Sequence, residues 1–515
     1  MPSIITIAFG TIVATYVFFR VLMVSTQDER EPQAIETNIP FLGPMVGMAR
    51  EKSSFYRRLR DDHHLPIYTL RLPFMRMYIV NSTELIPVLQ RYWRTISFSA
   101  LAIDAGRIIG MSRKAIDTME RDLTSKDGFS ASWPKYIAAV MGPGEDLDSM
   151  NRRSTEIYAA EMERLRAQGA SKIGLWQWSR QMMVVSTTEA VWGPQNPFRD
   201  PAIAEAWRFS YVELDSVPFA ACSQVDTRTR ESCCRFIRYM YNGGYKTASG
   251  LVRKRWEHHS SWGFTKEDMG RGELGNAFAV LGNSTPCALW VLYHILSDDA
   301  VLAQIRGELS ALVQHEKSGD INVKSLDLAR VRDACPIFLS TFQEVLRFRA
   351  VNPGPRVLLE DVDLNGFLLK KGSRLMIPAP VQHTDTSAWG TDAREFDHMR
   401  FVPVPGRKKP CKVAFRAFGG GHVLCPGRHF ASTEILALAA LLILQFDVAP
   451  SAGKWIEPTW RNSPLQAGFP VPDDDISIEL TPRESVAATK WHVTFSGSDN
   501  AMEIVTEDTV SDVNT

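Results

Sequence analysis

The sequence is short of cysteine and has no excess of either charge. Its 515 residues contain 7 cysteines, with no C-x-x-C pair or zinc-ligand spacing, and Lys+Arg equals Asp+Glu at 58 each. Scattered thiols in a chain of this size are typical of reduced, cytosol-facing proteins. Balanced charge gives no electrostatic reason to expect a nucleic-acid partner. A Rossmann fingerprint, a flavin domain and an iron–sulfur cysteine set are also missing, so electrons for a redox reaction must come from another protein.

One long apolar run stands at the N-terminus. Ile4–Val24 carries a single charge, Arg20, near its end. Roughly 20 helical residues span the ~30 Å apolar core of a bilayer. The flanks have neither a basic n-region nor a clear A-x-A site, which favours an uncleaved single-pass anchor over a cleaved signal peptide. We therefore expect a transmembrane anchor at 1–25 and a proline-containing linker at 26–50.

The rest of the chain has no Ser/Gly or Pro-rich linker and predicts one globular domain over 51–496, followed by a disordered acidic tail at 497–515. Helical spacing dominates, and the apolar segment Glu273–Leu296 predicts a long buried helix. Residues 66–80, rich in β-branched and aromatic side chains, predict a hairpin broken near Pro73. Asn365-Gly366 between apolar runs predicts a second hairpin. The predicted fold class is mainly α with a minor β portion, whose strands are expected within 66–80, 356–377 and 464–481.

The stretch 415–431, FRAFGGGHVLCPGRHFA, places one cysteine after three glycines and before Pro426-Gly427 and an apolar helix. Cys425 therefore precedes a helix N-terminus, where exposed N–H groups and the helix dipole favour a thiolate. Such a thiolate can ligate a soft metal or a haem iron, and on haem it favours O–O cleavage. Taken alone, a single cysteine of this kind is by default a buried structural thiol, and the local pattern does not overcome that default.

The wider pattern Phe418-x-x-Gly421-x-x-x-Cys425-x-Gly427 resembles the haem-ligand loop of the cytochrome P-450 family. This resemblance implies the P-450 fold, a haem b cofactor (iron protoporphyrin IX) and Cys425 as the axial iron ligand. Phe418, Gly421 and Gly427 would shape the loop around the haem.

Two further motifs follow the order of that family. Glu344-Val345-Leu346-Arg347 resembles its E-x-x-R helix motif, and EFDHMRF at 395–401 resembles its downstream aromatic-arginine segment, with His398 where proline is usual. Glu344 and Arg347 share a helix face at i,i+3 spacing. The resemblance implies a buried three-way network of Glu344, Arg347 and Arg400 that holds the scaffold below the haem.

The resemblance also implies partners for the haem propionates. Arg356 falls where the family has a propionate-binding arginine at a strand start. Val423 replaces the basic residue that is usual two positions before the cysteine, and His422 is the candidate substitute. The W-x-x-x-R pattern of the family is not visible near 143–154, where Arg152 and Arg153 are loose candidates.

The segment Leu281-Gly282-Asn283-Ser284-Thr285-Pro286 lies at the family's oxygen-activating position. Pro286 lacks an N–H and clashes with the carbonyl four residues earlier, which predicts a helix kink. Asn283 replaces the usual acid, and an amide can orient water but cannot exchange a proton at neutral pH. Ser284 or Thr285 would supply the hydroxyl. Asparagine before this proline resembles the branch with sterol 7α- and 12α-hydroxylases and prostacyclin synthase, which contains monooxygenases and an isomerase.

The resulting hypothesis is a haem-thiolate monooxygenase, single-pass in the endoplasmic reticulum membrane and facing the cytosol. It would use O2 and NADPH-cytochrome P-450 reductase, with cytochrome b5 as a further donor, and a lipophilic terpenoid- or steroid-like substrate or other secondary metabolite. An isomerase or dehydratase that needs no reductase, and a non-catalytic haem-binding protein, are the alternatives. The expected pocket side chains are apolar, and the expected reductase-docking face is basic. The pocket residues include Phe98, Ile103, Phe209, Phe219, Phe278, Val351 and Phe469, and the basic residues are Arg407, Lys408, Lys409, Lys412, Arg416 and Arg428.

Overall fold

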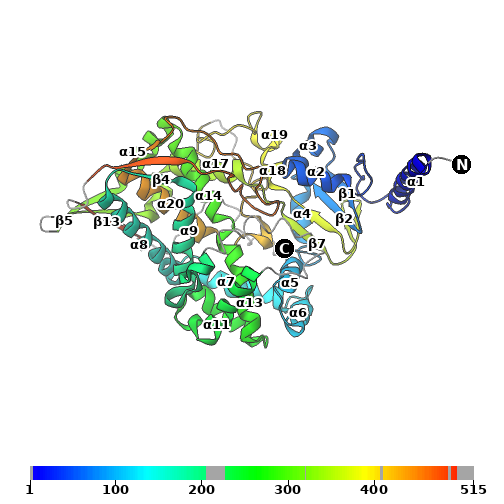
Figure 1. Ribbon diagram of the computed structural model, residues 1–515, viewed down its shortest axis with the longest axis horizontal. Coiled ribbons are helices and arrows are strands. Elements are labelled where there is room, and N and C mark those ends of the chain that lie inside the picture. The colour runs from blue at the N-terminus through cyan, green and yellow to red at the C-terminus, as the bar shows by residue number, and fades with distance from the viewer. Residues whose placement is uncertain (1–3, 205–226, 319–320, 406–409, 485–488, 496–515) are drawn as a thin grey trace. The chain divides into compact units, whose positions relative to one another are not determined.

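The computed structural model describes residues 4–204, 227–318, 321–405, 410–484 and 489–495, which form two compact units that alternate along the chain (Figure 1). Unit 1 comprises Met1–Ala102, Val351–Ala393 and Val413–Val423, and unit 2 comprises Ile103–Ala350, Arg394–Lys412 and Leu424–Thr515. The mainly helical fold class with minor sheets is confirmed. Three predicted features lie outside the described residues: the acidic tail at 497–515, pocket residues Phe209 and Phe219, and the basic run 407–409.

Unit 1 is built on a five-stranded sheet of order β1-β2-β10-β7-β3. Strand β2 pairs antiparallel with β1 and parallel with β10, and β7 pairs antiparallel with β10 and β3. Its buried side, including Ile67, Tyr78 and Leu375, packs against α4. The elements of unit 1 are α1 (Ile4–Ser25), α2 (Gly43–Glu51), α3 (Ser54–His63), β1 (Ile67–Leu72), β2 (Met75–Val80), α4 (Leu85–Arg91), β3 (Ile96–Ser97), β7 (Pro355–Leu358), β8 (Val362–Leu364), β9 (Phe367–Leu369), β10 (Arg374–Met376), α18 (Ala379–His383) and α19 (Thr386–Trp389).

Both predicted hairpins are present. Strands β1 and β2 are joined at Pro73 and Phe74, where proline ends the first strand. Strands β8 and β9 are joined by Asn365 and Gly366, with φ of 50° and 87°. Two consecutive residues with positive φ are what a two-residue hairpin turn requires, and asparagine followed by glycine tolerates that conformation best.

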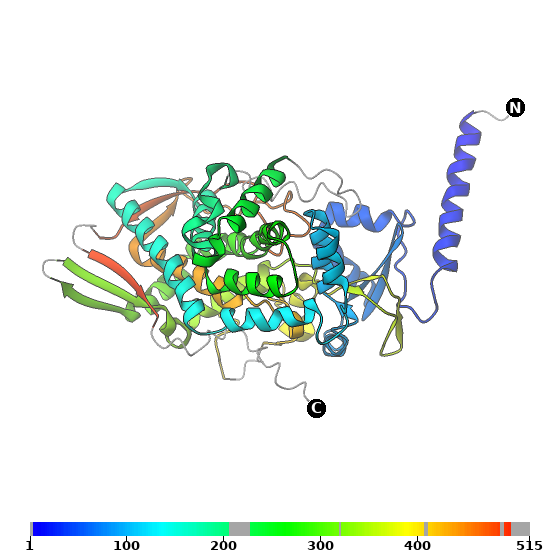
Figure 2. The same cartoon turned by 90° about the horizontal axis from the view of Figure 1, so that it is seen from below.

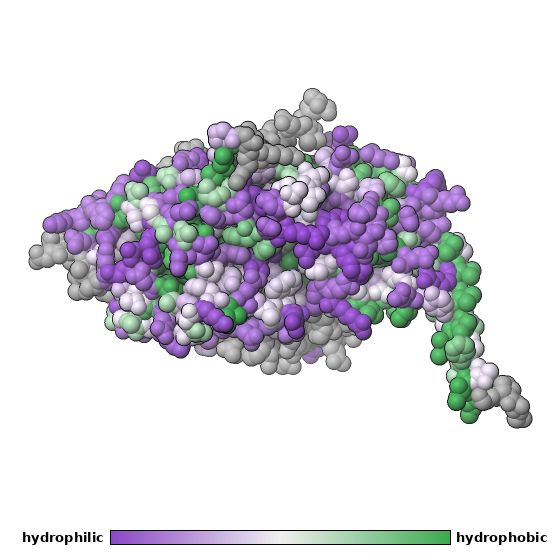
Figure 3. Space-filling model, turned by 90° about the horizontal axis from the view of Figure 1, so that it is seen from above, coloured by the Kyte–Doolittle hydropathy of each residue, from purple (hydrophilic) through white to green (hydrophobic). Residues whose placement is uncertain are grey.

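Helix α1 stands apart from the sheet of unit 1, and its apolar side chains are exposed (Figure 2 and Figure 3). It is long and apolar enough to cross a membrane. The Arg71 guanidinium of β1 donates hydrogen bonds to the Thr26 hydroxyl (2.7 Å) and the Gln27 side-chain oxygen (3.0 Å), just beyond the helix end. Arg76 of β2 donates to the Thr26 carbonyl (2.7 Å). The C-terminal end of this helix is therefore tied to the sheet by cations that complement its dipole.

Unit 2 is mostly helical. Helix α20 is buried over nearly its whole length and packs against α8, α14 and α15, while α11 packs against α13. Helix α5 (Ser99–Ile108) begins in unit 1 and ends in unit 2. The other helices of unit 2 are α6 (Arg113–Glu120), α7 (Phe129–Met141), α8 (Glu145–Gln168), α9 (Leu175–Trp192), α11 (Thr227–Tyr241), α12 (Gly250–Ser261), α13 (Lys266–Leu281), α14 (Ser284–Leu296), α15 (Asp299–Leu312), α16 (Val331–Ala334), α17 (Pro336–Arg349) and α20 (Arg428–Gln445).

Two three-stranded sheets complete unit 2, with orders β11-β12-β4 and β13-β6-β5. The strand expected within 464–481 forms only at its end, because residues 464–476 form irregular loop structure. Pro464, Pro470 and Pro472 lack the N–H that a ladder needs, so this stretch cannot pair continuously. The strands are β4 (Ser171–Gly174), β5 (Val313–Ser318), β6 (Ile321–Asp327), β11 (Phe446–Pro450), β12 (Ser477–Pro482) and β13 (Thr489–Thr494).

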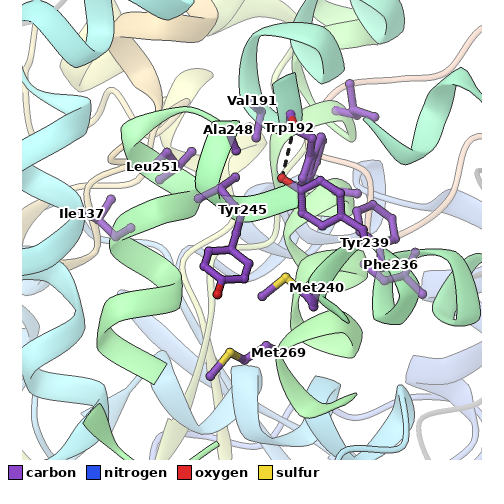
Figure 4. Packing of buried hydrophobic residues seen from close by; sticks show 14 of the residues in the cluster. Ile137, Val191, Trp192, Phe236, Tyr239, Met240, Tyr245, Ala248, Leu251 and Met269 are labelled. Carbon is purple, nitrogen blue, oxygen red and sulfur yellow. Dashed lines mark hydrogen bonds between the residues drawn. The ribbon is translucent and has the colours of Figure 1, made fainter. Parts of the chain in front are cut away.

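Aromatic side chains fill the core between α9, α11, α12 and α13 (Figure 4). Trp192 is fully buried, and its indole N–H donates to the Glu273 carboxylate (2.8 Å). The Tyr239 hydroxyl donates to the Trp192 carbonyl (3.2 Å). These bonds satisfy the polar atoms of large side chains that otherwise contribute apolar area, as buried tryptophan and tyrosine require.

The predicted long helix is present but interrupted. Helices α13 and α14 are separated by Gly282 and Asn283, and Pro286 lies in the first turn of α14. Together they bury most of their surface inside the protein, as does α20, so these apolar helices belong to the core of unit 2. The expectation that this segment is not a second membrane span agrees with its burial.

A buried carboxyl group lies where α20 packs against α8 and α9. Glu434 of α20 is almost fully buried and accepts hydrogen bonds from Ser154 (2.8 Å) and Thr187 (3.0 Å). No lysine or arginine bonds it among the described residues. Burial raises the pKa of Glu434 to about 8, and the two hydroxyl donors offset only part of that rise. The folded protein therefore holds this carboxyl protonated at neutral pH.

We predict that Glu434 makes the protein less stable as pH rises. Between its unfolded pKa of 4.5 and its folded pKa of about 8, the folded chain holds a proton that the unfolded chain has released. The free energy of unfolding should fall by up to ~1.4 kcal/mol per pH unit across this window. Urea unfolding of Glu434→Gln should lack this contribution, because glutamine stays neutral. Identical pH dependence in the two proteins would contradict the assignment.

Candidate active site

Cys425 lies three residues before α20, in the loop that carries the first motif. The residue is partly exposed, and the protein atoms around its thiol raise its pKa, while the N–H of Gly427 and the charge of Arg428 oppose that rise. A Cβ added at Gly427 would lie 3.9 Å from the Cys425 sulfur, in ordinary van der Waals contact, so Gly427 lies directly beside the sulfur. The sulfur has backbone N–H donors on the helix side, from Gly427 and Arg428.

Two further glycines of this loop have roles that other residues could not fill. Gly419 has φ of 80°, and Gly421 has φ of 58° with the Gln90 side chain 2.8 Å from where its Cβ would be. Both conformations favour glycine. Phe418 lies partly buried beside them. These residues up to Val423 belong to unit 1, whereas Cys425 and Gly427 belong to unit 2.

Glu344, Arg347 and Arg400 meet inside unit 2. Arg347 donates two hydrogen bonds to the Glu344 carboxylate (2.6 and 2.7 Å), and Arg400 donates a third (3.1 Å). Both arginines also donate to the Glu395 carbonyl (2.9 and 3.3 Å), and the Asp397 N–H donates to Glu344 (3.0 Å). All three charged side chains are buried. The network fixes residues 395–400 on α17.

Arg356 is buried in unit 1 beside another arginine. Among the described residues, its guanidinium hydrogen-bonds only to the carbonyl of its neighbour Pro355 (2.6 Å), and the Phe98 ring covers it. Burial and the charge of Arg416 lower the pKa of Arg356 to about 10. Two buried cations that repel each other form a site that an anion would stabilise.

His422 belongs to a second part of the same unit. Its ring stacks on Trp93 (centroids 4.5 Å apart), and burial and the charge of Arg94 lower its pKa. The Arg94 guanidinium lies over the Trp93 ring. The Arg94 Nε is buried and has no hydrogen-bond partner in the described chain. Sequence reasoning missed Trp93 and Arg94. The adjacent tryptophan and arginine just before a strand were the available signal.

The two loose candidates on α8 form exposed ion pairs: Arg152 pairs with Glu145 (2.5 Å) and Arg153 pairs with Glu156 (3.3 Å). Arg416 was expected on a basic docking face but is buried beside Arg356. A buried guanidinium cannot meet a protein partner.

The segment between α13 and α14 distinguishes the two candidate hydroxyls. Ser284 donates to the Val280 carbonyl (2.9 Å), so its hydroxyl is bonded to the last turn of α13. The Thr285 hydroxyl is fully buried and has no hydrogen-bond partner among the described residues. Asn283 is exposed, and its side-chain oxygen accepts from the Gly468 N–H (3.0 Å).

Comparison with known proteins identifies the family. Residues 257–478 match the family model for cytochrome P-450. A cytochrome P-450 monooxygenase of Hypoxylon pulicicidum, nodJ, is 31% identical over 93% of this chain and 95% of its own length. This chain belongs to the cytochrome P-450 family. It is thus an oxidoreductase of the monooxygenase type, in a family that binds haem iron.

Two more distant P-450 relatives match about half of the chain. Rat 25-hydroxycholesterol 7-alpha-hydroxylase is 27% identical over 45% of this chain and 58% of its own length. Bovine prostacyclin synthase is 26% identical over 45% of this chain and 50% of its own length. The predicted resemblance to the family and to this branch is confirmed.

The residues of this P-450 chain fit a haem. Cys425 offers a sulfur with helix N–H groups behind it, which suits an iron ligand. Arg356 offers a buried cation without an acidic partner in the described chain, which suits a propionate. Thr285 offers a buried hydroxyl that still needs a partner.

We predict that Glu344→Gln will unfold far more easily than the native protein. The substitution leaves Arg347 and Arg400 buried without a compensating charge, which should cost about 3–5 kcal/mol. Urea unfolding, with recovery of haem-loaded protein as a second readout, measures the loss. The exposed pair of Arg58 with Glu51 provides the control, because Glu51→Gln should cost only ~0–1 kcal/mol. Equal losses in the two variants would contradict a special role for the buried network.

Proposed function

We propose that this P-450 is a membrane-anchored, haem b-dependent monooxygenase that hydroxylates, or similarly oxidises, a lipophilic terpenoid- or steroid-like molecule or another secondary metabolite. Cys425 would be the axial iron ligand, with Arg356 and His422 as propionate partners. When bound, the haem supplies the reductive activation of O2 that inserts one oxygen atom into the substrate. The observation that carries the proposal is the Cys425 sulfur at the start of α20, where the N–H groups of Gly427 and Arg428 face it.

One exposed face of the buried helices α13 and α14 supports a distal site in unit 2. Ala279 and Asn283 are exposed while their neighbours Leu281 and Ser284 are buried, and Gly282 is partly exposed. The i,i+4 spacing puts Ala279 and Asn283 on one face. Small residues there leave room beside the helix for O2 and a substrate.

Thr285 is the better candidate for delivering a proton. Its hydroxyl is buried and has no partner among the described residues, whereas the Ser284 hydroxyl already donates to the Val280 carbonyl. A buried hydroxyl without a hydrogen-bond partner destabilises the folded protein. Such a hydroxyl is expected where a bound ligand supplies the missing partner. We assign Thr285 as the hydroxyl donor, and Asn283 as a neighbour that cannot itself exchange protons.

The proposed electron donor is an NADPH-cytochrome P-450 reductase, with cytochrome b5 as a further donor, because the sequence carries no flavin or iron–sulfur motif. Among the described residues expected on the basic docking face, Lys412 is exposed and Arg428 is partly exposed, whereas Arg416 is buried. Complementary charge of this kind accelerates association with an acidic partner.

The proposed location is the endoplasmic reticulum membrane, with residues 1–25 as the anchor, 26–50 as the linker and 51–496 facing the cytosol. The length and exposed apolar surface of α1 support the anchor. The described cysteines are all free, as expected of a domain in a reducing compartment. The bonds from Arg71 and Arg76 to residues 26 and 27 indicate that this linker is held against unit 1 at its start.

Substrate class follows from polarity. Among the residues expected to line the pocket, Phe469 and Ile103 are buried, Phe278 and Val351 are partly buried, and Phe98 is exposed. A lipophilic substrate would replace water at such side chains. The similarity to rat 25-hydroxycholesterol 7-alpha-hydroxylase supports a substrate of this type.

We predict product formation only with NADPH, reductase and O2, and transfer of the label from ¹⁸O₂ into the product. A panel of sterols and terpenes, screened by spin-state shift and mass spectrometry, supplies the substrate. Cys425→Ser should lose activity and the thiolate-type reduced-CO spectrum, whereas Cys411→Ser, another free cysteine, should retain both. Unlabelled product formed without reductase would instead support the isomerase or dehydratase alternative. Absence of a reduced-CO complex would support the non-catalytic one.

We predict that Thr285→Val will lower product formation on the order of 10²-fold while peroxide release per NADPH rises, since a positioned proton donor is lost. Folding stability should not fall, because valine removes a buried hydroxyl that lacks a partner. Ser284→Ala should keep most of the coupling between NADPH consumption and product. If Ser284→Ala uncouples the reaction and Thr285→Val does not, the assignment is reversed.

A further inference from the structure

The loop 463–471 is tied to α14 and the residue before it at two points. The Asn283 side-chain oxygen accepts from the Gly468 N–H (3.0 Å), and the Trp290 indole N–H donates to the Pro470 carbonyl (2.7 Å). Asn283 and Trp290 are seven residues apart, so they lie on one helix face, two turns apart. Both ties lie within unit 2.

The position of Gly468 is set by this contact. Its φ is not positive, so its backbone does not require glycine. A Cβ at Gly468 would instead lie 2.5 Å from the Asn283 side-chain oxygen, which is far inside van der Waals contact. The residue is glycine because Asn283 occupies the space that a side chain would need. The loop and the helix interruption are therefore fitted to each other.

Phe469 lies between the two tied residues and is buried. Its neighbours on both sides are held by hydrogen bonds, so its ring has little freedom to move away from α14. Trp290 is itself held, because the Arg349 guanidinium lies 4.0 Å from its ring centroid. Any substrate that contacts Phe469 meets a side chain whose place depends on Asn283.

The same contact limits what Asn283 can do for water. Its oxygen is engaged by Gly468, and its backbone carbonyl accepts from the Cys287 N–H (3.2 Å). To orient water, Asn283 therefore has its amide N–H groups and the second lone pair of its side-chain oxygen. Thr285 follows two residues later on the same turn, so a movement of Asn283 would move Thr285 as well.

We propose that Asn283 is a positioning residue, whose side-chain oxygen holds the Gly468–Pro470 loop against the helix interruption and so sets the place of a substrate relative to Thr285. This inference rests on the proposed monooxygenase function. It assigns substrate placement, rather than proton transfer, to the residue that replaces the usual acid. Asparagine suits this role because its neutral oxygen accepts from a backbone N–H without placing a charge in the site.

Hydrogen–deuterium exchange of the full chain tests the tie directly. Asn283→Ala removes the acceptor, so amides in 465–471 should exchange about fivefold faster, in line with the loss of one hydrogen bond. Asn283→Asp keeps an acceptor and should retain slow exchange. Asn276→Ala is the control, because the Asn276 amide bonds Glu273 and does not contact the loop. Unchanged exchange in Asn283→Ala would overturn the proposal.

Ligand binding separates positioning from a purely structural role. With clotrimazole as the probe, read by its spectral shift, the dissociation constant should rise about fivefold in Asn283→Ala and recover in Asn283→Asp. Gly468→Ala should weaken binding in the native background but add little in the Asn283→Ala background, where the clash is gone. Additive effects of the two substitutions, or equal binding by Asn283→Ala and the native protein, would overturn it.

The outcomes also distinguish this inference from the proposed function. If the loop loosens in Asn283→Ala but no ¹⁸O enters any product, the tie is real and the monooxygenase proposal fails. If ¹⁸O enters the product while loop exchange and clotrimazole binding do not respond to Asn283, the function holds and the positioning role fails.

Discussion

The buried carboxylate of Glu344 is the interaction on which unit 2 most depends. It carries hydrogen bonds from two arginines and one backbone N–H, so one acidic group joins α17 to the segment 395–400. Burying one negative charge between two positive ones is tolerable only when every donor finds an acceptor. The Glu395 carbonyl completes that requirement for both arginines. The segment that leads toward the cysteine loop therefore starts from a fixed point.

The cysteine loop applies a related constraint through shape. Glycines at 419 and 421 remove side chains where backbone conformation or nearby atoms leave no room. Helix α20 then begins within three residues of the sulfur and is buried throughout. A buried helix cannot shift without loss of apolar contact, so its N-terminal N–H groups stay directed at Cys425. Helix burial and the glycine-containing loop thus hold the sulfur at the N-terminus of α20.

The interrupted helix pair α13 and α14 combines strength with an opening. Most of its surface is buried, yet Asn283 at the interruption is exposed and bonds a distant loop. Pro286, in the first turn of α14, lacks the N–H that a continuous helix would need. The exposed Asn283 lies two positions before the buried Thr285 hydroxyl. The interruption leaves Asn283 exposed, and its side-chain oxygen accepts from the Gly468 N–H.

The sequence by itself determined the family, the helical class, both hairpins and the contact of Glu344 with its arginines, because these depend on local spacing and on motifs that keep their order. Tertiary structure alone decided which cation is buried and which polar atom lacks a partner. Arg416 looked like a surface charge, yet it lies buried beside Arg356 because residues remote in sequence cover it. Trp93 with Arg94, the buried acid Glu434, and the bond from Gly468 to Asn283 join segments far apart in the chain. Periodicity reports what lies a few residues away, whereas burial and hydrogen bonding depend on whatever the folded chain brings alongside.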